Sequence, residues 1–439
     1  MSRIYKAPAR SASATSAARQ QVTDTVAAII EDVRQNGDNA VRRYAEKFDG
    51  TAPASFLLTQ EDIAAAVRQV PGTVLDDVTF VQQQVRTFAQ AQRDTLTDVE
   101  VETLPGVHLG QRHIPVSAAG AYVPGGRYPL LASAHMTIVT AKVACVPRVA
   151  ACTPPIHGEL PAASIAAMHL AGADEIYLFG GAQAIAALAV GTESIDPVHI
   201  LTGPGNAYVA EAKRQLFGEV GIDLFAGPTE TLIIADDTAD PFMVAVDLLS
   251  QAEHGPDSPA VLITTSQAVA EQASQAVREL LPGMPTRDYA EPSWRDYGEI
   301  HLVDDLERAY ALANEFASEH VQILTAHPRD ALSKMTNYGA LFLGERTTVS
   351  FGDKVIGTNH VLPTRKAARY TGGLWVGKFL KTVTYQEITD DAASARLGEL
   401  CGRASRAERF EGHARSGDLR AARFGSARLP WVPPVSQLA

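Results

Sequence analysis

The spacing of apolar residues changes along the chain and separates a helical part from strand-rich parts. In the first hundred residues, apolar positions recur every three or four residues, which is typical of amphipathic helices. Gly37 and Gly50 end two of these segments, and Thr59 is a suitable N-cap for a third. The pattern therefore predicts helices over residues 23–36, 37–49, 59–70 and 73–93, after an arm of about twenty Ala-, Ser- and Arg-rich residues.

From about Val99 the pattern becomes that of strands. The short alternating runs "VEVETL" and "HLGQRHIPV" predict a β-hairpin. Short apolar runs such as "EIYLFGG" then alternate with helical segments such as "AQAIAALAVG", and the rhythm returns between "AVLITTS" and "VQILTA". Buried apolar strands that alternate with helices indicate parallel sheets with helical crossovers, so two α/β domains are expected. The tail from about Thr371 shows a helical, Arg-rich pattern without strands, and we expect it to pack on another domain or another subunit.

Composition excludes several classes of protein. A net charge of −12 over 439 residues argues against a nucleic-acid footprint, which needs clustered Lys and Arg. The three cysteines, Cys145, Cys152 and Cys401, form no CxxC pair, so neither a disulfide framework nor a thiolate zinc knuckle is expected. The first twenty residues lack the apolar core of a signal peptide, and no segment has the length of a membrane span. We therefore expect a cytoplasmic protein without membrane or nucleic-acid partners.

Two Glu-His pairs are the first candidates for chemistry. Gln251 and His254 in "SQAEHG" lie three residues apart, so on a helix they share one face and can contribute two ligands to a zinc ion. The alternative is a histidine favoured by the dipole at the end of a helix. In "SEHV", His320 suits a general base and Glu319 suits a group that orients it or polarises water. The alternative there is a surface pair.

The segment "SFGDKVIGTNHVLPT" adds an acid and an imidazole. Asp353 lies between two glycines, and His360 follows it seven residues later. This arrangement suits a metal carboxylate beside a substrate contact. A structural loop with a buried Asp353 is the alternative.

Two glycine-rich turns lie between an apolar strand and a helix, in "FGGAQAIAAL" and "LTGPGNAYVAEAK". Free N–H groups and the helix dipole at such a turn favour a phosphate, although tight turns alone explain the glycines equally well. No GxGxxG is present, because Tyr208 occupies the position of the third glycine in "GPGNAY". A dinucleotide would therefore have to bind in an unusual way.

Taken together, "GAYVPGG", "TGPGNAYVAEAKRQLFGEVGID", "SQAEHG", "SEH" and "GDKVIGTNHVLPT" resemble the histidinol dehydrogenase family over nearly the whole chain. The resemblance implies a zinc- and NAD+-dependent homodimer that oxidises a primary alcohol to a carboxylate through a bound aldehyde, using two NAD+. It also implies two incomplete Rossmann-like domains with parallel sheets and helical N- and C-terminal extensions, swapped between subunits. The implied division is an arm over 1–21, a metal and acid/base domain over 22–121 and 231–368, an NAD domain over 122–230, and a tail over 369–439 on the partner subunit.

The resemblance also implies a role for each matching residue. Glu319 and His320 are the expected acid/base pair, and His320 also lies at the substrate. The expected zinc ligands are Gln251, His254, Asp353 and His413, the last from the partner subunit, and all four also lie at the substrate. The remaining expected substrate contacts are Thr229, His360 and Glu408, and the expected NAD contacts are Tyr122, Gln183 and Asn206.

Departures from the family pattern bear on the substrate. The family usually has a "YPSSVLM"-like run after the Gly-Gly turn, where this chain has "RYPLLASAHM". Arg127 and His135 thereby enter the region of the expected pocket, and an added Arg and His suit an anionic group. The alternative for Arg127 is the cap of a turn. The pattern favours an alcohol such as 2,3-dihydroxypropane-1-sulfonate over L-histidinol, with histidinol oxidation as the alternative. A zinc hydrolase and a non-catalytic binding protein are the rival classes, and no HExxH supports the hydrolase.

Overall fold

The structure is a computed structural model that describes residues 2–9, 16–125, 130–224 and 227–431. The chain forms two compact units: a first unit of Met1–Arg93 with Pro115–Phe379, and a second unit of Asp94–Ile114 with Leu380–Ala439. Both units mix helices with sheet, and the expected mixed α/β class is confirmed. None of the helices within the described residues is both long and apolar enough to cross a bilayer.

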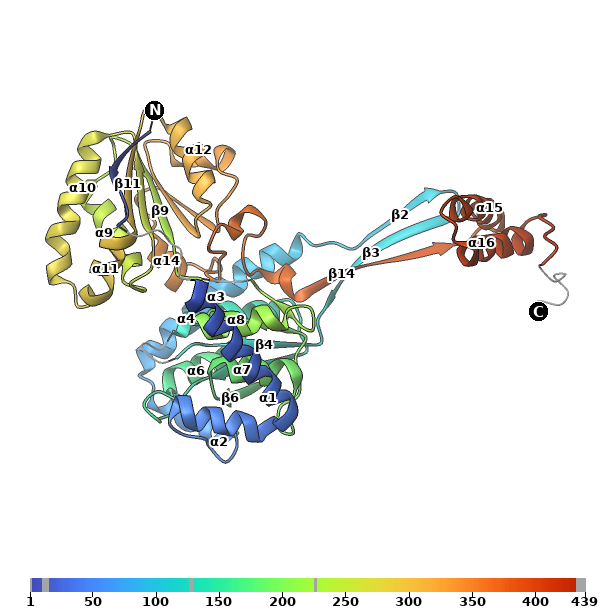
Figure 1. Ribbon diagram of the computed structural model, residues 1–439, viewed down its shortest axis with the longest axis horizontal. Helices are drawn as coiled ribbons and strands as arrows, with labels where there is room; N and C mark the ends of the chain where they lie inside the picture. The colour runs from blue at the N-terminus through green and yellow to red at the C-terminus, as the bar shows by residue number, and fades with distance from the viewer. Residues whose placement is uncertain (1, 10–15, 126–129, 225–226, 432–439) are drawn as a thin grey trace. The chain divides into compact units, whose positions relative to one another are not determined.

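The first unit contains a six-stranded sheet in the order β1-β11-β10-β9-β12-β13 (Figure 1). Five of its strands are parallel, and β1 pairs antiparallel with β11 at one edge. In β9, alternate apolar residues face two separate cores, so both faces of the sheet are buried. Its strands are β1 (Ser2–Lys6), β9 (Thr231–Ala235), β10 (Ala260–Thr264), β11 (Gly298–Val303), β12 (His320–Leu324) and β13 (Ala340–Leu343). Its helices are α9 (Pro241–Ala252), α10 (Gln267–Leu280), α11 (Arg287–Tyr297), α12 (Leu306–Phe316), α13 (Ala331–Lys334) and α14 (Val349–Lys354).

The first unit also contains a five-stranded, fully parallel sheet in the order β6-β5-β4-β7-β8. The chain builds β4, β5 and β6 outward in one direction and then returns to place β7 on the other side of β4. Its strands are β4 (Ala118–Tyr122), β5 (Arg148–Thr153), β6 (Glu175–Leu178), β7 (Ile200–Thr202) and β8 (Gly221–Ile222). The connecting segments are α4 (Leu131–Ala134), the π-helical turn η1 (His135–Val139), α5 (Thr140–Val143), α6 (Ala162–Ala171), α7 (Gly181–Val190) and α8 (Ala207–Leu216).

The N-terminal helices confirm the helical pattern expected for the first hundred residues. They are α1 (Ser16–Asp49), kinked at Gly37, α2 (Gln60–Gln69), capped by Thr59, and α3 (Gly72–Asp94). The apolar face of α1, including Val26 and Val33, packs in one core with Ile185 and Leu188 of α7. The predicted grouping of 22–121 with 231–368 stays a prediction, and the apolar stripe of α1 is buried against helices of the five-stranded sheet.

The expected N-terminal arm is only partly correct. Residues 2–6 form strand β1, whose backbone pairs with β11. The Lys6 ammonium lies over the Trp294 ring, 4.8 Å from its centroid. These contacts attach the start of the chain to the edge of the sheet, where an unpaired strand would otherwise expose its backbone groups.

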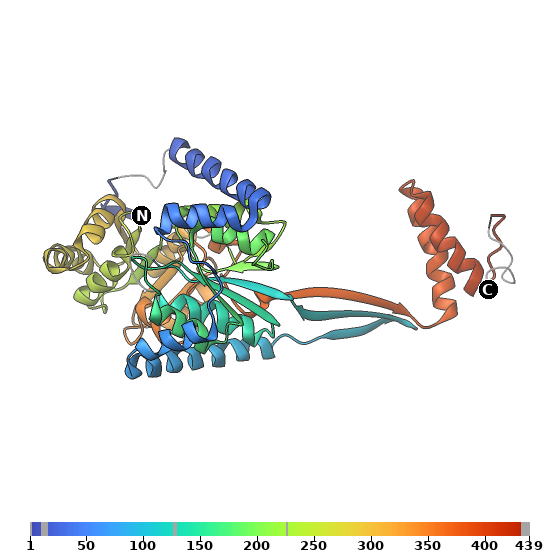
Figure 2. The same cartoon turned by 90° about the horizontal axis from the view of Figure 1, so that it is seen from below.

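The second unit contains the predicted hairpin, an additional strand and two helices (Figure 2). Strands β2 (Val99–Leu104) and β3 (Val107–Pro115) are antiparallel, as expected. The tail was expected to lack strands, but β14 (Leu380–Ile388) pairs with β3. Helices α15 (Asp391–Ala407) and α16 (Glu411–Phe424) follow it, and the Gly398 and Gly417 backbones come so close that a side chain at either would clash.

Candidate functional site

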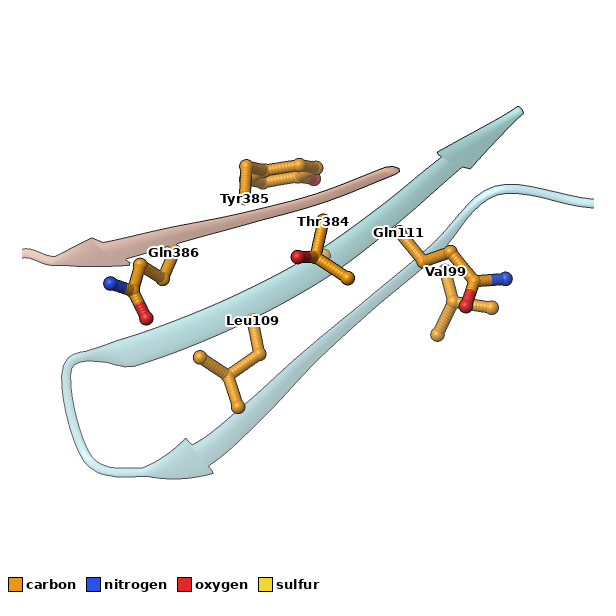
Figure 3. A pocket seen from close by; sticks show the side chains of 7 residues that line it. Val99, Leu109, Gln111, Thr384, Tyr385 and Gln386 are labelled. Carbon is orange, nitrogen blue, oxygen red and sulfur yellow. The ribbon is translucent and has the colours of Figure 1, made fainter. Parts of the chain in front are cut away.

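A shallow groove lies on the three-stranded sheet of the second unit (Figure 3). The Tyr385 ring lies flat over the sheet, against Gly110, which has no side chain to obstruct it. The groove is lined by apolar, hydroxyl and amide side chains: Val99, Leu109, Gln111, Thr384, Tyr385 and Gln386. None of these is a predicted site residue, so the groove carries no part of the candidate active site.

The Glu319–His320 pair lies at the amino-terminal edge of the six-stranded sheet, where β12 begins at His320. Parallel sheets usually bind ligands at their carboxyl edge, so this pair lies at the edge opposite the usual one. The pair is buried, with His320 2% and Glu319 6% exposed. His320 Nδ1 lies 3.5 Å from Glu319 Oε2, so the two side chains face each other rather than forming a solvent-exposed surface pair.

Glu230 holds both members of the pair in place through its backbone. Its N–H donates to Glu319 Oε2 at 3.0 Å, and its carbonyl accepts from the Nδ1 of His320 at 3.1 Å. With the proton on Nδ1, the Nε2 of a neutral His320 carries the lone pair of a base. Within the described part of the chain, this buried Nε2 has no hydrogen-bond partner. Glu230 was not predicted as a site residue, although it directly follows Thr229 in the chain.

The charges around His320 control its protonation. Burial alone lowers the pKa of His320, but the carboxylates of Glu319 and Asp353 outweigh it and raise that pKa to about 9. Burial raises the pKa of Glu319 to about 8, although the His320 charge opposes the shift. Asp353 Oδ1 lies 3.6 Å from His320 Nε2. Burial opposes ionisation of Asp353, but His320 overcomes this and lowers the pKa of Asp353 to about 2.

His360 belongs to the same cluster. Its Nδ1 lies 3.2 Å from the Asp353 carbonyl and donates to it, so its Nε2 is an acceptor. Burial lowers the pKa of His360 to about 4, against the attraction of Asp353. The imidazole is therefore neutral at pH 7 and offers a lone pair beside Asp353.

Gln251 and His254 do not share a helical face as expected, because α9 ends at Ala252, between them. Gln251 is in the last turn and 2% exposed, while His254 follows the helix and its N–H bonds to the Gln251 carbonyl at 3.2 Å. The Gln251 side-chain oxygen is buried without a hydrogen-bond partner among the described residues. His254 is accessible, yet desolvation by the surrounding protein lowers its pKa below the ordinary value.

Asp247 connects the three elements that carry these groups. It lies one turn before Gln251 on α9, and it accepts from Gln322 Nε2 at 2.7 Å, two residues after His320 on β12. It also accepts from Thr348 Oγ1 at 3.2 Å, at the start of α14, which carries Asp353. Sequence reasoning missed Asp247, because its partners are distant in the chain.

Three of the four predicted zinc ligands lie in the first unit, in the protonation states that a divalent cation requires. Gln251 offers an unpaired amide oxygen, His254 a neutral imidazole and Asp353 an ionised carboxylate, which is a nitrogen and oxygen donor set that zinc accepts. Within the described residues, no cluster of three or more His, Cys, Asp or Glu side chains forms a metal site by itself. His413 and Glu408 belong to the second unit, on α16 and at the end of α15.

The three predicted NAD contacts lie at the carboxyl edge of the five-stranded sheet. Tyr122 ends β4, Gln183 lies in the first turn of α7, and Asn206 caps α8 after β7. The chain reverses its direction of strand addition between β4 and β7, and a crevice at such a point is where doubly wound sheets bind ligands. Gln183 is 1% exposed, and neither its amide nitrogen nor its amide oxygen has a hydrogen-bond partner in the described residues. These unpaired groups suit a bond to a polar ligand.

The Gly-Pro-Gly turn that follows β7 is held by a buried ion pair. Lys213 and Asp223 face each other, with side chains 4% and 0% exposed. Lys213 donates to the Gly203 carbonyl at 2.8 Å, and Asp223 accepts from the Gly203 N–H at 2.7 Å. Gly203 has φ of 115°, and a side chain there would clash with the Tyr122 carbonyl. The ion pair therefore fixes the turn through both the N–H and the carbonyl of Gly203.

The remaining predicted substrate contacts differ in what the structure shows of them. Arg127 lies outside the described residues. Thr229 is half-buried and directly precedes Glu230. His135 is 3% exposed in η1, and burial, with a smaller contribution from His360, lowers its pKa to about 4.

Comparison with known proteins places this geometry in a class. A family model described as histidinol dehydrogenase matches residues 12–421. The histidinol dehydrogenase of Elizabethkingia anophelis has a similar structure, with a TM-score of 0.86, 31% identity, and coverage of 93% of this chain and 96% of that one. The class is therefore that of the dehydrogenases.

Curated relatives narrow the class to a family. A histidinol dehydrogenase homolog of Shouchella clausii is 58% identical over 405 residues, covering 92% of this chain and 95% of the relative. A sulfopropanediol 3-dehydrogenase of Ruegeria pomeroyi is 48% identical over 406 residues, covering 92% and 93%. A histidinol dehydrogenase of Gluconobacter oxydans is 42% identical over 403 residues, covering 91% and 93%. The chain belongs to the histidinol dehydrogenase family, as its motifs predicted.

Proposed function

We propose that the protein is a zinc-dependent dehydrogenase that oxidises a primary alcohol to a carboxylate with two NAD+, through a bound aldehyde. The observation that carries this proposal is the buried Glu319–His320 pair, oriented by the Glu230 backbone and adjoined by Asp353. It provides an imidazole base and a carboxylate side by side, away from bulk water. An oxidation in two steps needs one group to take a hydroxyl proton and another to activate water.

The two members of the pair have separate roles in this proposal. His320 Nε2 removes the proton of the substrate hydroxyl while hydride leaves the carbon that bears this hydroxyl. Glu319 then accepts a proton from the water that attacks the aldehyde. Gln251, His254 and Asp353, with His413 of a partner subunit in a domain-swapped dimer, would hold the zinc. Tyr122, Gln183 and Asn206 would hold the NAD+. When bound, NAD+ supplies the hydride acceptor, and zinc supplies a positive charge that orients the substrate oxygen and offsets the carboxylates that raise the pKa of His320.

We propose an alcohol with an acidic end group as the substrate, such as 2,3-dihydroxypropane-1-sulfonate. The identity of 48% to the Ruegeria pomeroyi sulfopropanediol 3-dehydrogenase supports this choice over histidinol, since the Gluconobacter oxydans histidinol dehydrogenase is 42% identical. His135, which stands where the family usually has a serine-rich run, supports it as well.

A side-by-side turnover assay tests the proposal. Zinc-loaded enzyme and NAD+ are mixed with 2,3-dihydroxypropane-1-sulfonate or with L-histidinol, and the absorbance of NADH is followed. We expect a higher kcat/KM for the sulfonate, loss of turnover after chelation, and recovery when zinc is returned. A higher kcat/KM for L-histidinol would overturn the substrate, and full activity of the chelated enzyme would overturn the metal.

A further inference from the structure

His135 occupies an unusual turn beside the loop that carries His360. It begins the π-helical segment η1, which interrupts the helix between α4 and α5. Asn359, next to His360, donates from Nδ2 to the Met136 carbonyl at 3.0 Å and so ties the loop to this turn. π-helical turns are rare and occur frequently at functional sites.

Gln82 on α3 determines which nitrogen of His135 carries the proton. Its amide is buried, 5% exposed, and its Nε2 contacts both the Ala167 carbonyl at 2.8 Å and His135 Nδ1 at 3.1 Å. The carbonyl only accepts, so the NH2 group of the amide must face it, which settles the orientation of the amide. The second N–H of that group then donates to His135 Nδ1, so the ring proton of a neutral His135 is on Nε2.

The protein around His135 keeps the ring neutral. Burial, with a smaller contribution from His360, lowers the pKa of His135 to about 4. Among the described residues, Gln82 is the only hydrogen-bond partner of the ring, and it occupies Nδ1. The Nε2–H is thus a donor without a protein acceptor in that part of the chain.

The neighbouring imidazoles offer the opposite polarity. The Nδ1 atoms of His320 and His360 donate to the backbone carbonyls of Glu230 and Asp353. The Nε2 of His360, and the Nε2 of His320 when that ring is neutral, are therefore acceptors without a hydrogen-bond partner among the described residues. His135 differs because a side-chain amide, rather than a carbonyl, lies at its Nδ1. The cluster therefore combines the acceptor atoms of His320 and His360 with one donor, the Nε2–H of His135.

We propose that Gln82 is a positioning residue that fixes His135 as a hydrogen-bond donor to the non-reacting end of the substrate, and that this end carries an acceptor-only group such as a sulfonate or carboxylate. This inference rests on the proposed function and specifies its substrate class. An ammonium group only donates, so it finds no lone pair on His135 Nε2, whereas an anionic oxygen matches the N–H.

Ring nitrogen NMR tests the positioning role without any need for turnover. The full-length, zinc-loaded enzyme is labelled with 15N-histidine, and the His135 signals are identified by their loss in His135→Gln. We expect a neutral ring with the proton on Nε2 at pH 7, and a change in that tautomer in Gln82→Leu. Gln83→Leu, an exposed neighbour on the same helix, is the matched control and should leave the signals unchanged. A proton on Nδ1, or an imidazolium, in the wild type would overturn the role of Gln82.

Kinetics and calorimetry with 2,3-dihydroxypropane-1-sulfonate test the substrate contact. Since a hydrogen bond to a charged group contributes about 1.5–3 kcal/mol, we expect His135→Phe to raise KM by roughly 10- to 100-fold with little change in kcat. His135→Gln restores a donor and should recover most of the affinity. An unchanged KM in His135→Phe, or a fall in kcat alone, would overturn the contact.

The binding measurement separates this inference from the proposed function. If the wild type reduces no NAD+ with either alcohol, the proposed function fails, and calorimetric binding of the sulfonate to wild type and His135→Phe still decides the contact. Weaker binding to His135→Phe supports it. Equal binding to both proteins, or no binding to either, overturns it.

Discussion

At the scale of single residues, the backbone of Glu230 orients both side chains of the Glu319–His320 pair. Its N–H bonds to the Glu319 carboxylate, and its carbonyl keeps the His320 proton on Nδ1. Both are backbone groups, so their positions do not depend on a side-chain rotamer. A base whose lone pair must face the substrate benefits from such a fixed support.

Replacing the base tests this arrangement. We expect His320→Gln to lower kcat by roughly 10²- to 10⁴-fold, because a positioned base contributes about that much to proton transfer. His301→Gln is the matched control, since His301 is also a buried strand histidine of the same sheet and bonds to Glu299 instead. Steady-state kinetics on both variants gives the comparison. A loss of kcat in His301→Gln equal to that in His320→Gln would indicate general damage to the sheet.

The half-buried Asp49 gives a prediction about pH and stability. Burial raises the pKa of Asp49 to about 6, although a backbone hydrogen bond from Gly180 opposes the shift. The folded state therefore binds the proton more tightly than the unfolded state, whose carboxyl has a pKa near 3.8. The stability that this protonation contributes is complete below about pH 3.8 and is lost as the pH rises through about 6.

Asp49→Asn removes the titrating group while keeping the shape of the side chain. We expect it to increase the unfolding free energy at pH 7.5 by on the order of 1 kcal/mol, allowing for solvent screening, and to have little effect near pH 4. Urea unfolding at the two pH values measures the difference. An equal effect at both pH values would contradict the assignment of the shift to Asp49.

A site residue could be predicted from the sequence where a short motif around it indicates its chemistry. His320, Asp353 and His360 stand in distinctive motifs, and the structure brings them together. Glu230 and Asp247 act on residues about 90 and 75 positions away, and such pairings are set by the order of strands in the sheet rather than by local sequence. The roles of Glu230 and Asp247 therefore follow only from the three-dimensional fold.

At the scale of elements, Asp247 joins α9, β12 and the start of α14. Gln322 and Thr348 both donate to its carboxylate, which is buried in this network. These elements carry Gln251, His320 and Asp353. The spacing among the proposed metal ligands and the base therefore depends on one carboxylate that touches none of the reacting groups.

Removing this connection should weaken metal binding. We expect Asp247→Ala to lower zinc affinity by roughly 10- to 100-fold, because groups that hold ligands in place have effects of that size. Asp240→Ala is the matched control: Asp240 caps the other end of α9, and its loss should cost about 1 kcal/mol of stability without changing zinc affinity. Competition with a chelating dye measures both. Equal zinc affinity in the two variants would contradict the role of Asp247.

The elements themselves were mostly readable from periodicity, with two instructive exceptions. The capped helix α2 and the hairpin of β2 and β3 formed as expected, because their signals are local. Strand β14 was missed, since "LKTVTYQEI" is almost entirely exposed in this chain and lacks a buried face that would reveal its period. The packing partner of α1 could not be predicted either, because an apolar stripe predicts burial but not against which sheet.

At the scale of the whole molecule, our proposal needs residues of two subunits. The acid/base pair and three of the proposed zinc ligands belong to the first unit of one subunit, and His413 and Glu408, which belong to the second unit, would come from its partner. The second unit exposes apolar strand residues such as Val101 and Tyr385, and such surfaces are typical of contact faces. A swapped dimer that shares its sites follows from our proposal.

Subunit mixing tests the shared site. His320→Ala and His413→Ala should each be inactive as homodimers. In a mixed dimer, one site combines an intact His320 with the partner's intact His413, so we expect activity to return when differently tagged chains are refolded together and purified as heterodimers. Confirmed heterodimers that stay inactive would contradict a site shared between subunits.

The ratio of NADH formed to alcohol consumed tests the central claim most directly. A limiting amount of 2,3-dihydroxypropane-1-sulfonate is converted to completion by zinc-loaded enzyme with excess NAD+, and both NADH and the organic product are quantified. The account predicts two NADH for each alcohol, a carboxylate as the final product and no accumulating aldehyde. One NADH for each alcohol with an aldehyde as the product, or carboxylate formation without NADH, would contradict it.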